Sequence, residues 1–106
     1  MKRRITSSMN EVPDLSDYLH KYVKSIIVDV ENLFDSYIKE NITDWDEFTY
    51  DNVDEYAEEV YDYFIKDVEL AEPSVEYLII LDMPKEVVVR ALSHELYFQK
   101  KVMEGN

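Results

Sequence analysis

Apolar residues recur at intervals of three and four along the first half of this chain, and this spacing restricts the fold more than any other feature. The series consists of Leu15, Tyr18, Leu19, Tyr22, Ile26, Val30, Leu33, Phe34, Tyr37 and Ile38. An α-helix has 3.6 residues per turn, so this spacing lines one helix face with apolar side chains. We predict one helix over about residues 14–40. Pro13 and Asp14 suit its first turn, and Asn41 can end it.

The same spacing returns further along the chain and predicts a second helix over residues 52–70. Its apolar stripe consists of Val53, Ala57, Val60, Phe64 and Val68. Between the two helices, Thr43 is expected to cap a short turn that runs to Phe48.

Glu72-Pro73-Ser74 then interrupts the pattern. The apolar run that follows fits a short helix over residues 75–82 capped by Ser74, and a short strand over residues 76–81 is the alternative. Pro84 is expected to open a last helix that ends near Met103. Its inward-facing residues are predicted to be Val87, Val88, Ala91, Leu92, Leu96 and Phe98. Lys100 and Lys101 are expected to complement the dipole at its C-terminal end.

These segments predict an all-α fold, a small single-domain helical bundle of three to five helices. The 106 residues fit one domain, and the aromatic content with a single glycine argues against disorder. We expect a flexible basic arm over residues 1–12 and an acidic helical domain over residues 13–104. No apolar run approaches the roughly 20 residues that cross a bilayer, and no signal peptide is evident, so we predict a cytoplasmic protein without a membrane contact.

Negative charge is concentrated in the middle of the chain. The formal net charge is −13, and the stretch from Asp29 to Glu76 holds seventeen acidic residues against two basic ones. Such a charge repels nucleic acids and anionic lipids, so direct binding to either is not expected. A basic protein is the natural partner.

The second predicted helix gathers much of this charge on one side. At about 100° per residue, Asp51, Glu55, Glu58, Asp62 and Glu69 fall within a narrow arc, and Asp54 and Glu59 flank it. Steps of three or four residues separate the carboxylates by roughly 5–6 Å along the axis. Phosphates of one DNA strand recur about every 7 Å along the backbone, a comparable interval.

This arrangement of charge opposes folding. Seven like-charge pairs at spacings of three or four residues between Asp51 and Asp62 cost together on the order of 1.5–3.5 kcal/mol at low salt. Lysine at Glu58 or Glu59 is expected to relieve this repulsion. Charge retained at such a cost suggests a use outside the fold, and the alternative is an acidic surface that serves solubility alone.

Enzyme chemistry has little support in the sequence. The chain has no cysteine, and Gly105 is its only glycine, so thiolate chemistry and glycine-rich phosphate loops are excluded. Asp44, Asp46 and Glu55 fit an EF-hand register, but Phe48 and Thr49 occupy a ligand position and the glycine position of that loop. We therefore predict a protein that is not an enzyme and that has no metal site and no cofactor.

Two stretches of the chain resemble the Ocr-type phage antirestriction proteins, which are DNA mimics. The first contains Leu33-Phe34-Asp35 and Lys39-Glu40-Asn41-Ile42, followed by Asp44, Asp46 and the acidic helix; the second contains Leu81-Asp82-Met83-Pro84-Lys85, then residues 87–92 and Glu95-Leu96-Tyr97. The resemblance implies a dimeric all-helical protein that fills the DNA groove of a phage-defence enzyme. The basic residues Lys2, Arg3 and Arg4 are unlike such a mimic.

The leading hypothesis is therefore an acidic DNA mimic that inhibits a DNA-binding host-defence enzyme of the restriction-modification or CRISPR type. Its partner would be a basic nuclease, methyltransferase or CRISPR effector in the host cytoplasm, and a homodimer is a further expectation. The predicted partner-binding residues are Asp44, Asp46, Glu47, Asp51, Asp54, Glu55, Tyr56, Glu58, Glu59, Asp62 and Tyr63. The tyrosines are included because tyrosine is enriched at binding hot spots. Two alternatives remain open, an immunity protein or antitoxin that neutralises a basic toxin, and an acidic adaptor domain.

Overall fold

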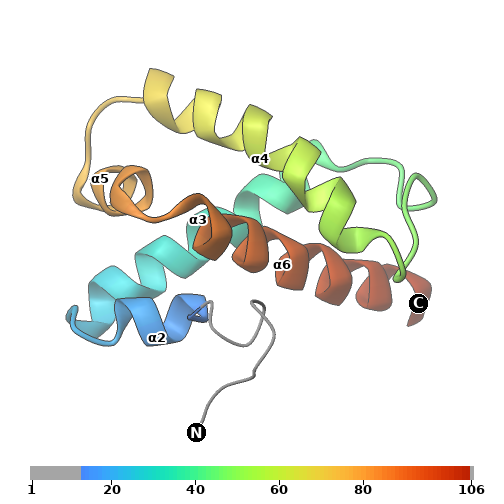
Figure 1. Ribbon diagram of the computed structural model, residues 1–106, viewed down its shortest axis with the longest axis horizontal. Coiled ribbons are helices and arrows are strands. Elements are labelled where there is room, and N and C mark those ends of the chain that lie inside the picture. The colour runs from blue at the N-terminus through green and yellow to red at the C-terminus, as the bar shows by residue number, and fades with distance from the viewer. Residues whose placement is uncertain (1–12, 106) are drawn as a thin grey trace, which may run out of the picture.

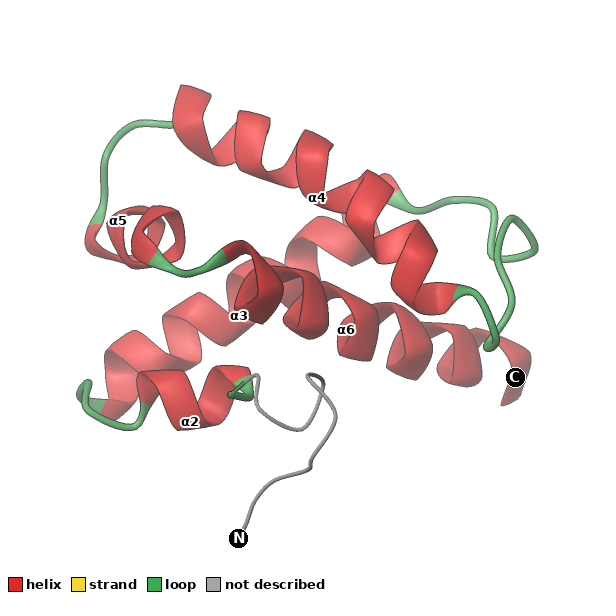
Figure 2. Ribbon diagram, viewed as in Figure 1, coloured by secondary structure: helices red, strands yellow, loops and turns green. Residues whose placement is uncertain are grey.

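The computed structural model describes residues 13–105, and this part of the chain contains five helices and no strand. The helices are α2 (Leu15–Leu19), α3 (Lys24–Asn41), α4 (Val53–Leu70), α5 (Val75–Asp82) and α6 (Lys85–Gly105) (Figures 1 and 2). The predicted all-α fold is confirmed. The predicted arm over 1–12 lies outside the described residues. None of the helices within residues 13–105 is long and apolar enough to cross a membrane.

Helix α6 is the centre of the bundle and contacts α2, α3 and α4, while α5 contacts α3 and α4 and closes one end (Figure 1). The ring of Phe64 from α4 joins two layers of the core. Its centroid lies 5.1 Å from that of Phe34 and 4.9 Å from that of Tyr37, both on α3. Val88, Leu92 and Leu96 from α6 are fully buried beside them.

The single helix predicted over residues 14–40 is wrong, because the chain turns between α2 and α3. Val23 is extended, with φ −70° and ψ 154°, and the amide of Tyr22 donates to the carbonyl of Leu19 at 2.9 Å. The turn places α2 against α6, where Asp14 pairs with Arg90 at 2.7 Å. Val23 is itself β-branched and has a lower helix propensity than straight-chain residues, which lowers the cost of a break here.

The predictions for the next two helices are confirmed. Helix α4 begins one residue later than predicted and buries the expected stripe. Helix α5 matches residues 75–82, and the side chain of Ser74 accepts a hydrogen bond from the amide of Tyr77 at 3.3 Å. The alternative strand over 76–81 is therefore wrong. In the turn between α3 and α4, Thr43 was predicted to be the capping residue. There Asp44 makes the side-chain bond instead, because its carboxylate accepts a hydrogen bond from the amide of Asp46.

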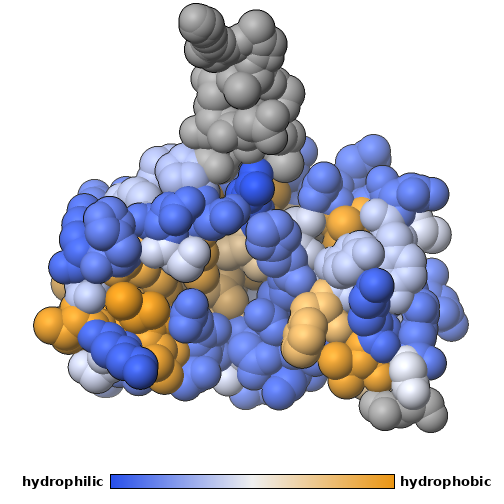
Figure 3. All heavy atoms as spheres, turned by 90° about the horizontal axis from the view of Figure 1, so that it is seen from below, coloured by the Kyte–Doolittle hydropathy of each residue, from blue (hydrophilic) through white to orange (hydrophobic). Residues whose placement is uncertain are grey.

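Helix α6 begins directly after Pro84 and buries the predicted residues with one exception. Phe98 was expected to face the core, yet 59% of its surface is exposed, and Gln99 is buried in its place. Gln99 donates to Asp35 at 2.7 Å and to Glu95 at 2.9 Å. Figure 3 shows apolar surface at both ends of the lower face of the molecule. The cover over this side of α6 ends before Phe98: Ala91, two turns earlier on the same side of the helix, is buried, whereas Phe98 is not.

Lys100 was predicted to act as a charge at the C-terminal end of α6. It is instead buried under the loop between α3 and α4. Its ammonium group donates to the backbone carbonyl of Trp45 at 2.5 Å and pairs with Glu104 at 3.2 Å. It also lies over the rings of Phe48, at 5.1 Å, and Tyr50, at 5.6 Å. One buried cation thus organises an acidic loop that contributes residues to the site described next.

Candidate partner-binding surface

The outer side of α4 presents a row of carboxylates to solvent. Burial of the apolar stripe against α3 and α6 fixes the rotation of the helix, so the opposite side faces outward. We call this side the acidic face; its residues are Glu55, Glu58, Asp62 and Glu69, all of them exposed. Asp51, which was predicted to share the same arc, lies in the turn before α4 and is also exposed.

Little positive charge reaches the acidic face. Within residues 13–105 the one salt bridge to it joins Lys85 to Glu58, with an N–O distance of 3.7 Å between two exposed side chains. The same Lys85 lies over the ring of Tyr61, 5.4 Å from its centroid. Lysine at Glu58 would lose this exposed pair and face Lys85, which offsets part of the relief gained from Asp54, Glu55 and Asp62, so the predicted relief of repulsion stays a prediction at Glu58 and at Glu59.

Asp54 was predicted to flank the acidic face, but its side chain points toward α6. Its carboxylate accepts a short hydrogen bond from the hydroxyl of Ser93, a residue that is otherwise buried. Asp54 therefore links α4 to α6, and we assign it to the packing of the bundle as well as to its acidic surface.

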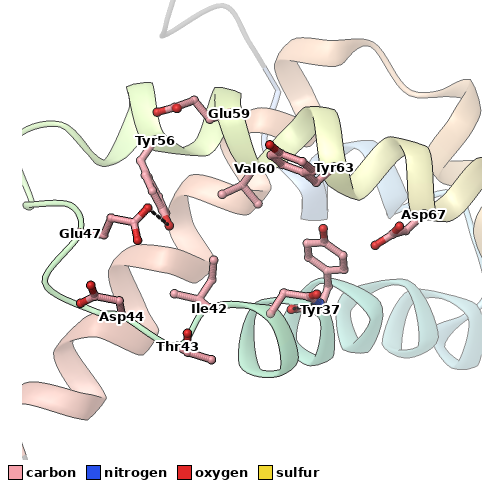
Figure 4. A pocket seen from close by; sticks show the side chains of 11 residues that line it. Tyr37, Ile42, Thr43, Asp44, Glu47, Tyr56, Glu59, Val60, Tyr63 and Asp67 are labelled. Carbon is pink, nitrogen blue, oxygen red and sulfur yellow. Dashed lines mark hydrogen bonds between the residues drawn. The ribbon is translucent and has the colours of Figure 1, made fainter.

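A second group of predicted residues lines a groove between the C-terminal end of α3, the following loop and α4 (Figure 4). The volume of this α3–α4 groove is about 450 Å³. Its lining residues are Tyr37, Asn41, Ile42, Thr43, Asp44, Glu47, Tyr56, Glu59, Val60, Tyr63 and Asp67. The predicted site is thus divided between a convex acidic face and a concave groove, and Glu59 and Tyr63 lie where the two meet.

Aromatic stacking holds the loop side of the groove in place. Phe48 is almost fully buried and stacks on Tyr56 with a centroid distance of 4.6 Å, and Trp45 packs on Phe48 at 6.0 Å. The hydroxyl of Tyr56 donates to Glu47 at 3.4 Å across the groove wall. Burial, with the charge and hydrogen bond of Glu47, raises the pKa of Tyr56. Asp46 is exposed but does not line the groove.

On the opposite wall, Tyr37 extends from α3 toward α4 and lies beside Asp67 (Figure 4). Burial and the negative charge of Asp67 raise the pKa of Tyr37 from 10.0 to about 12. The folded protein therefore favours the neutral phenol. The contribution of Tyr37 to stability is complete below pH 10.0 and is lost as the pH rises through about 12.

Replacement of Asp67 by Asn is expected to lower the pKa of Tyr37 only in part, because burial is the larger cause and remains. The ring-carbon chemical shift of Tyr37, followed against pH, measures this change. The loss of unfolding free energy above pH 10.0 should become shallower in the same variant. A titration of Tyr37 identical to that of the unmodified protein would contradict the assignment.

Tyr37 and Asp67 were missed among the predicted binding residues. Tyr37 was assigned to the apolar face of its helix. This assignment is correct for the ring, but it did not consider that the hydroxyl group reaches the groove. Asp67 stands four residues after Tyr63, and this spacing places the two on one side of α4. The sequence therefore held a signal for Asp67.

No protein family, no curated protein and no solved structure matches the chain. Within residues 13–105, no three acidic or histidine side chains are grouped closely enough to hold a metal ion. The carboxylates of this surface are instead spread along a helix and around a groove.

Proposed function

We propose that this protein is an acidic DNA mimic that occupies the DNA-binding groove of a basic host-defence enzyme. The observation that supports the proposal is the acidic face of α4. Glu55, Asp62 and Glu69 are exposed there and have no ion-pair partner within residues 13–105. A surface kept acidic for solubility gains nothing from holding its charges in one row, whereas a mimic of a phosphate backbone requires a row.

The dimensions of the acidic face also suit this role. Glu55 and Glu69 are fourteen residues apart, which corresponds to about 21 Å along a helix. Phosphates of one strand recur about every 7 Å, so this row spans roughly three phosphate intervals. A groove lined by lysine and arginine could therefore receive the carboxylates at positions that phosphates normally occupy.

This geometry supports a partner that normally binds DNA. We propose a nuclease, methyltransferase or CRISPR effector, encountered in the cytoplasm of a bacterial host if the protein is phage-encoded. Binding would be fast and sensitive to salt, because charge complementarity steers association. The protein itself would act without catalysis, and the homodimer implied by the resemblance to Ocr-type proteins stays a prediction.

Charge reversal on the acidic face is expected to separate binding from stability. Asp62→Lys gains contacts with Glu58 and Glu59, and Glu69→Lys places a cation in the last turn of α4, where the dipole favours it. Both new lysines also face Lys66, at spacings of four and three residues, which offsets part of this gain. The double variant should keep its unfolding free energy within about 1 kcal/mol, yet bind its partner at least roughly tenfold more weakly.

The matched control is Asp29→Lys combined with Glu40→Lys, which changes the net charge equally at exposed positions of α3. It should bind within about threefold of the unmodified protein, as surface charges outside the contact act weakly through a screened field. Urea unfolding gives the stabilities, and association kinetics give the affinities. Equal losses of binding in both double variants would mean that net charge, and not the acidic face, governs the interaction.

The partner is first obtained by capture on the immobilised protein from bacterial lysate at low salt. We expect a DNA-binding enzyme that is released by added duplex DNA, and we expect the purified pair to show competition with DNA, with a raised KM for DNA and an unchanged kcat. A captured protein that duplex DNA cannot displace would support the immunity-protein alternative. Absence of any partner would support the adaptor alternative.

A further inference from the structure

The α3–α4 groove combines a hollow, aromatic walls and uncompensated negative charge. Tyr37, Tyr56 and Tyr63 supply the rings, and carboxylates occur on the loop and on α4, while none of the lining residues is lysine or arginine. We propose that this groove binds the guanidinium group of one arginine side chain from the protein partner. The proposal rests on the proposed function, because the arginine is one that the DNA-binding partner would present.

Two independent features of the groove favour a cation. Asp44 and Glu47 stand on the loop wall, and Glu59 and Asp67 stand on α4, so a positive group would be approached by carboxylates from both sides (Figure 4). Aromatic faces attract cations through the quadrupole of the ring, at about 0.5–2 kcal/mol for each contact. Tyr37 and Tyr56 are partly buried, so such contacts in the groove are partly shielded from water.

The arrangement suits arginine better than lysine or a metal ion. A guanidinium group is planar, stacks on aromatic rings and offers five donors to separate acceptors, whereas an ammonium group is compact and strongly hydrated. The carboxylates here stand around a wide rim and not at one point, in agreement with the lack of a metal-sized cluster in the described residues. Ile42 and Val60 provide an apolar surface for the methylene stem of the side chain.

Tyr63 occupies the edge at which a partner would enter. Its side chain is 70% exposed, and it lines both the α3–α4 groove and a shallower hollow shared with Asp62 and Lys66. A large exposed aromatic residue between two hollows is costly to leave in water and is typical of a binding hot spot. Its position joins the groove to the acidic face, so a partner bound to that face would place side chains directly above the groove.

The experiment uses the full chain, isotope-labelled, with Nα-acetyl-arginine methylamide as the probe. We expect saturable changes of amide chemical shifts around the groove, with a dissociation constant on the order of millimolar for so small a ligand. The lysine analogue should bind about fivefold more weakly, and the neutral citrulline analogue at least about tenfold more weakly. Shift changes spread over the whole acidic surface, or equal binding of the lysine or citrulline analogue, would overturn the proposal.

Variants at the groove provide a second measurement. Tyr63→Ala removes an exposed side chain and should leave the fold intact, yet weaken the arginine probe by about fivefold or more. Phe98→Ala removes another largely exposed ring, from α6 and away from the groove, and should leave probe binding unchanged. Equal effects of the two variants would contradict an arginine site. The probe experiment does not involve the partner. If the arginine probe does not bind, the DNA-mimic proposal is unaffected, and if DNA does not compete for the partner, the arginine site is unaffected.

Discussion

Replacement of Lys100 by Met is expected to destabilise the protein by about 2–4 kcal/mol, a large part of the roughly 5–15 kcal/mol that holds a domain of this size together. Methionine keeps the apolar stem but leaves the carbonyl of Trp45 without its donor, which costs about 1–3 kcal/mol when such a group is buried. The cation–π contacts with Phe48 and Tyr50 are lost as well. Urea unfolding measures the total effect.

The adjacent lysine gives the control for this prediction. Lys101 carries the same charge on the same helix but is exposed, and its ammonium group lies over the ring of Tyr97 at 5.2 Å. Lys101→Met should cost less than about 1 kcal/mol. Trp45 is the only tryptophan, so its fluorescence reports on the loop and should shift to the red only in the Lys100 variant. Equal unfolding energies in the two variants would refute the structural role of Lys100.

The second large effect is expected at Phe64. Its truncation to Ala should cost about 3–5 kcal/mol, because the ring contacts Phe34 and Tyr37 in the layer between α4 and α3. The cavity would also admit water to the phenol of Tyr37. Since burial is the first cause of its raised pKa, that pKa should fall back toward 10.0.

Phe98→Ala is the matched control, since it removes the same ring from a position that is 59% exposed. We expect a change within about 0.5 kcal/mol and no effect on Tyr37. A cost similar to that of Phe64→Ala would show that Phe98 belongs to the core, as its spacing on α6 had predicted.

Local signals in the sequence predicted most of the helices correctly. Helix α4 carries a regular apolar stripe, and α5 follows a serine that can cap it, so the period and the cap each identify an element without long-range information. The turn after Leu19 was missed because the intervals between apolar residues continue across it. The spacing of apolar residues indicates which residues are buried, but it does not indicate where the chain changes direction.

The errors at Phe98 and Lys100 have a different cause, since both depend on what covers α6 from outside. Phe98 lies beyond the covered part of its side of α6, whereas the loop after α3 closes over Lys100. The groove was missed because it also depends on tertiary packing: Tyr37 and Asp67 lie thirty residues apart and meet only when α3 and α4 are paired. Individual acidic residues are visible in a sequence, but a concave surface is a property of packed helices.

Because of the turn between α2 and α3, local unfolding should cost less free energy at α2 than in the rest of the bundle. A helix of five residues cannot persist alone in water, so α2 survives only while Leu19 and the pair between Asp14 and Arg90 hold it to α6. Thermal fraying should therefore begin at this corner. The α3–α4 groove lies at the other end of α3 and shares no residue with α2. The least durable part of the molecule can thus melt and re-form while the surface that would meet a partner keeps its shape.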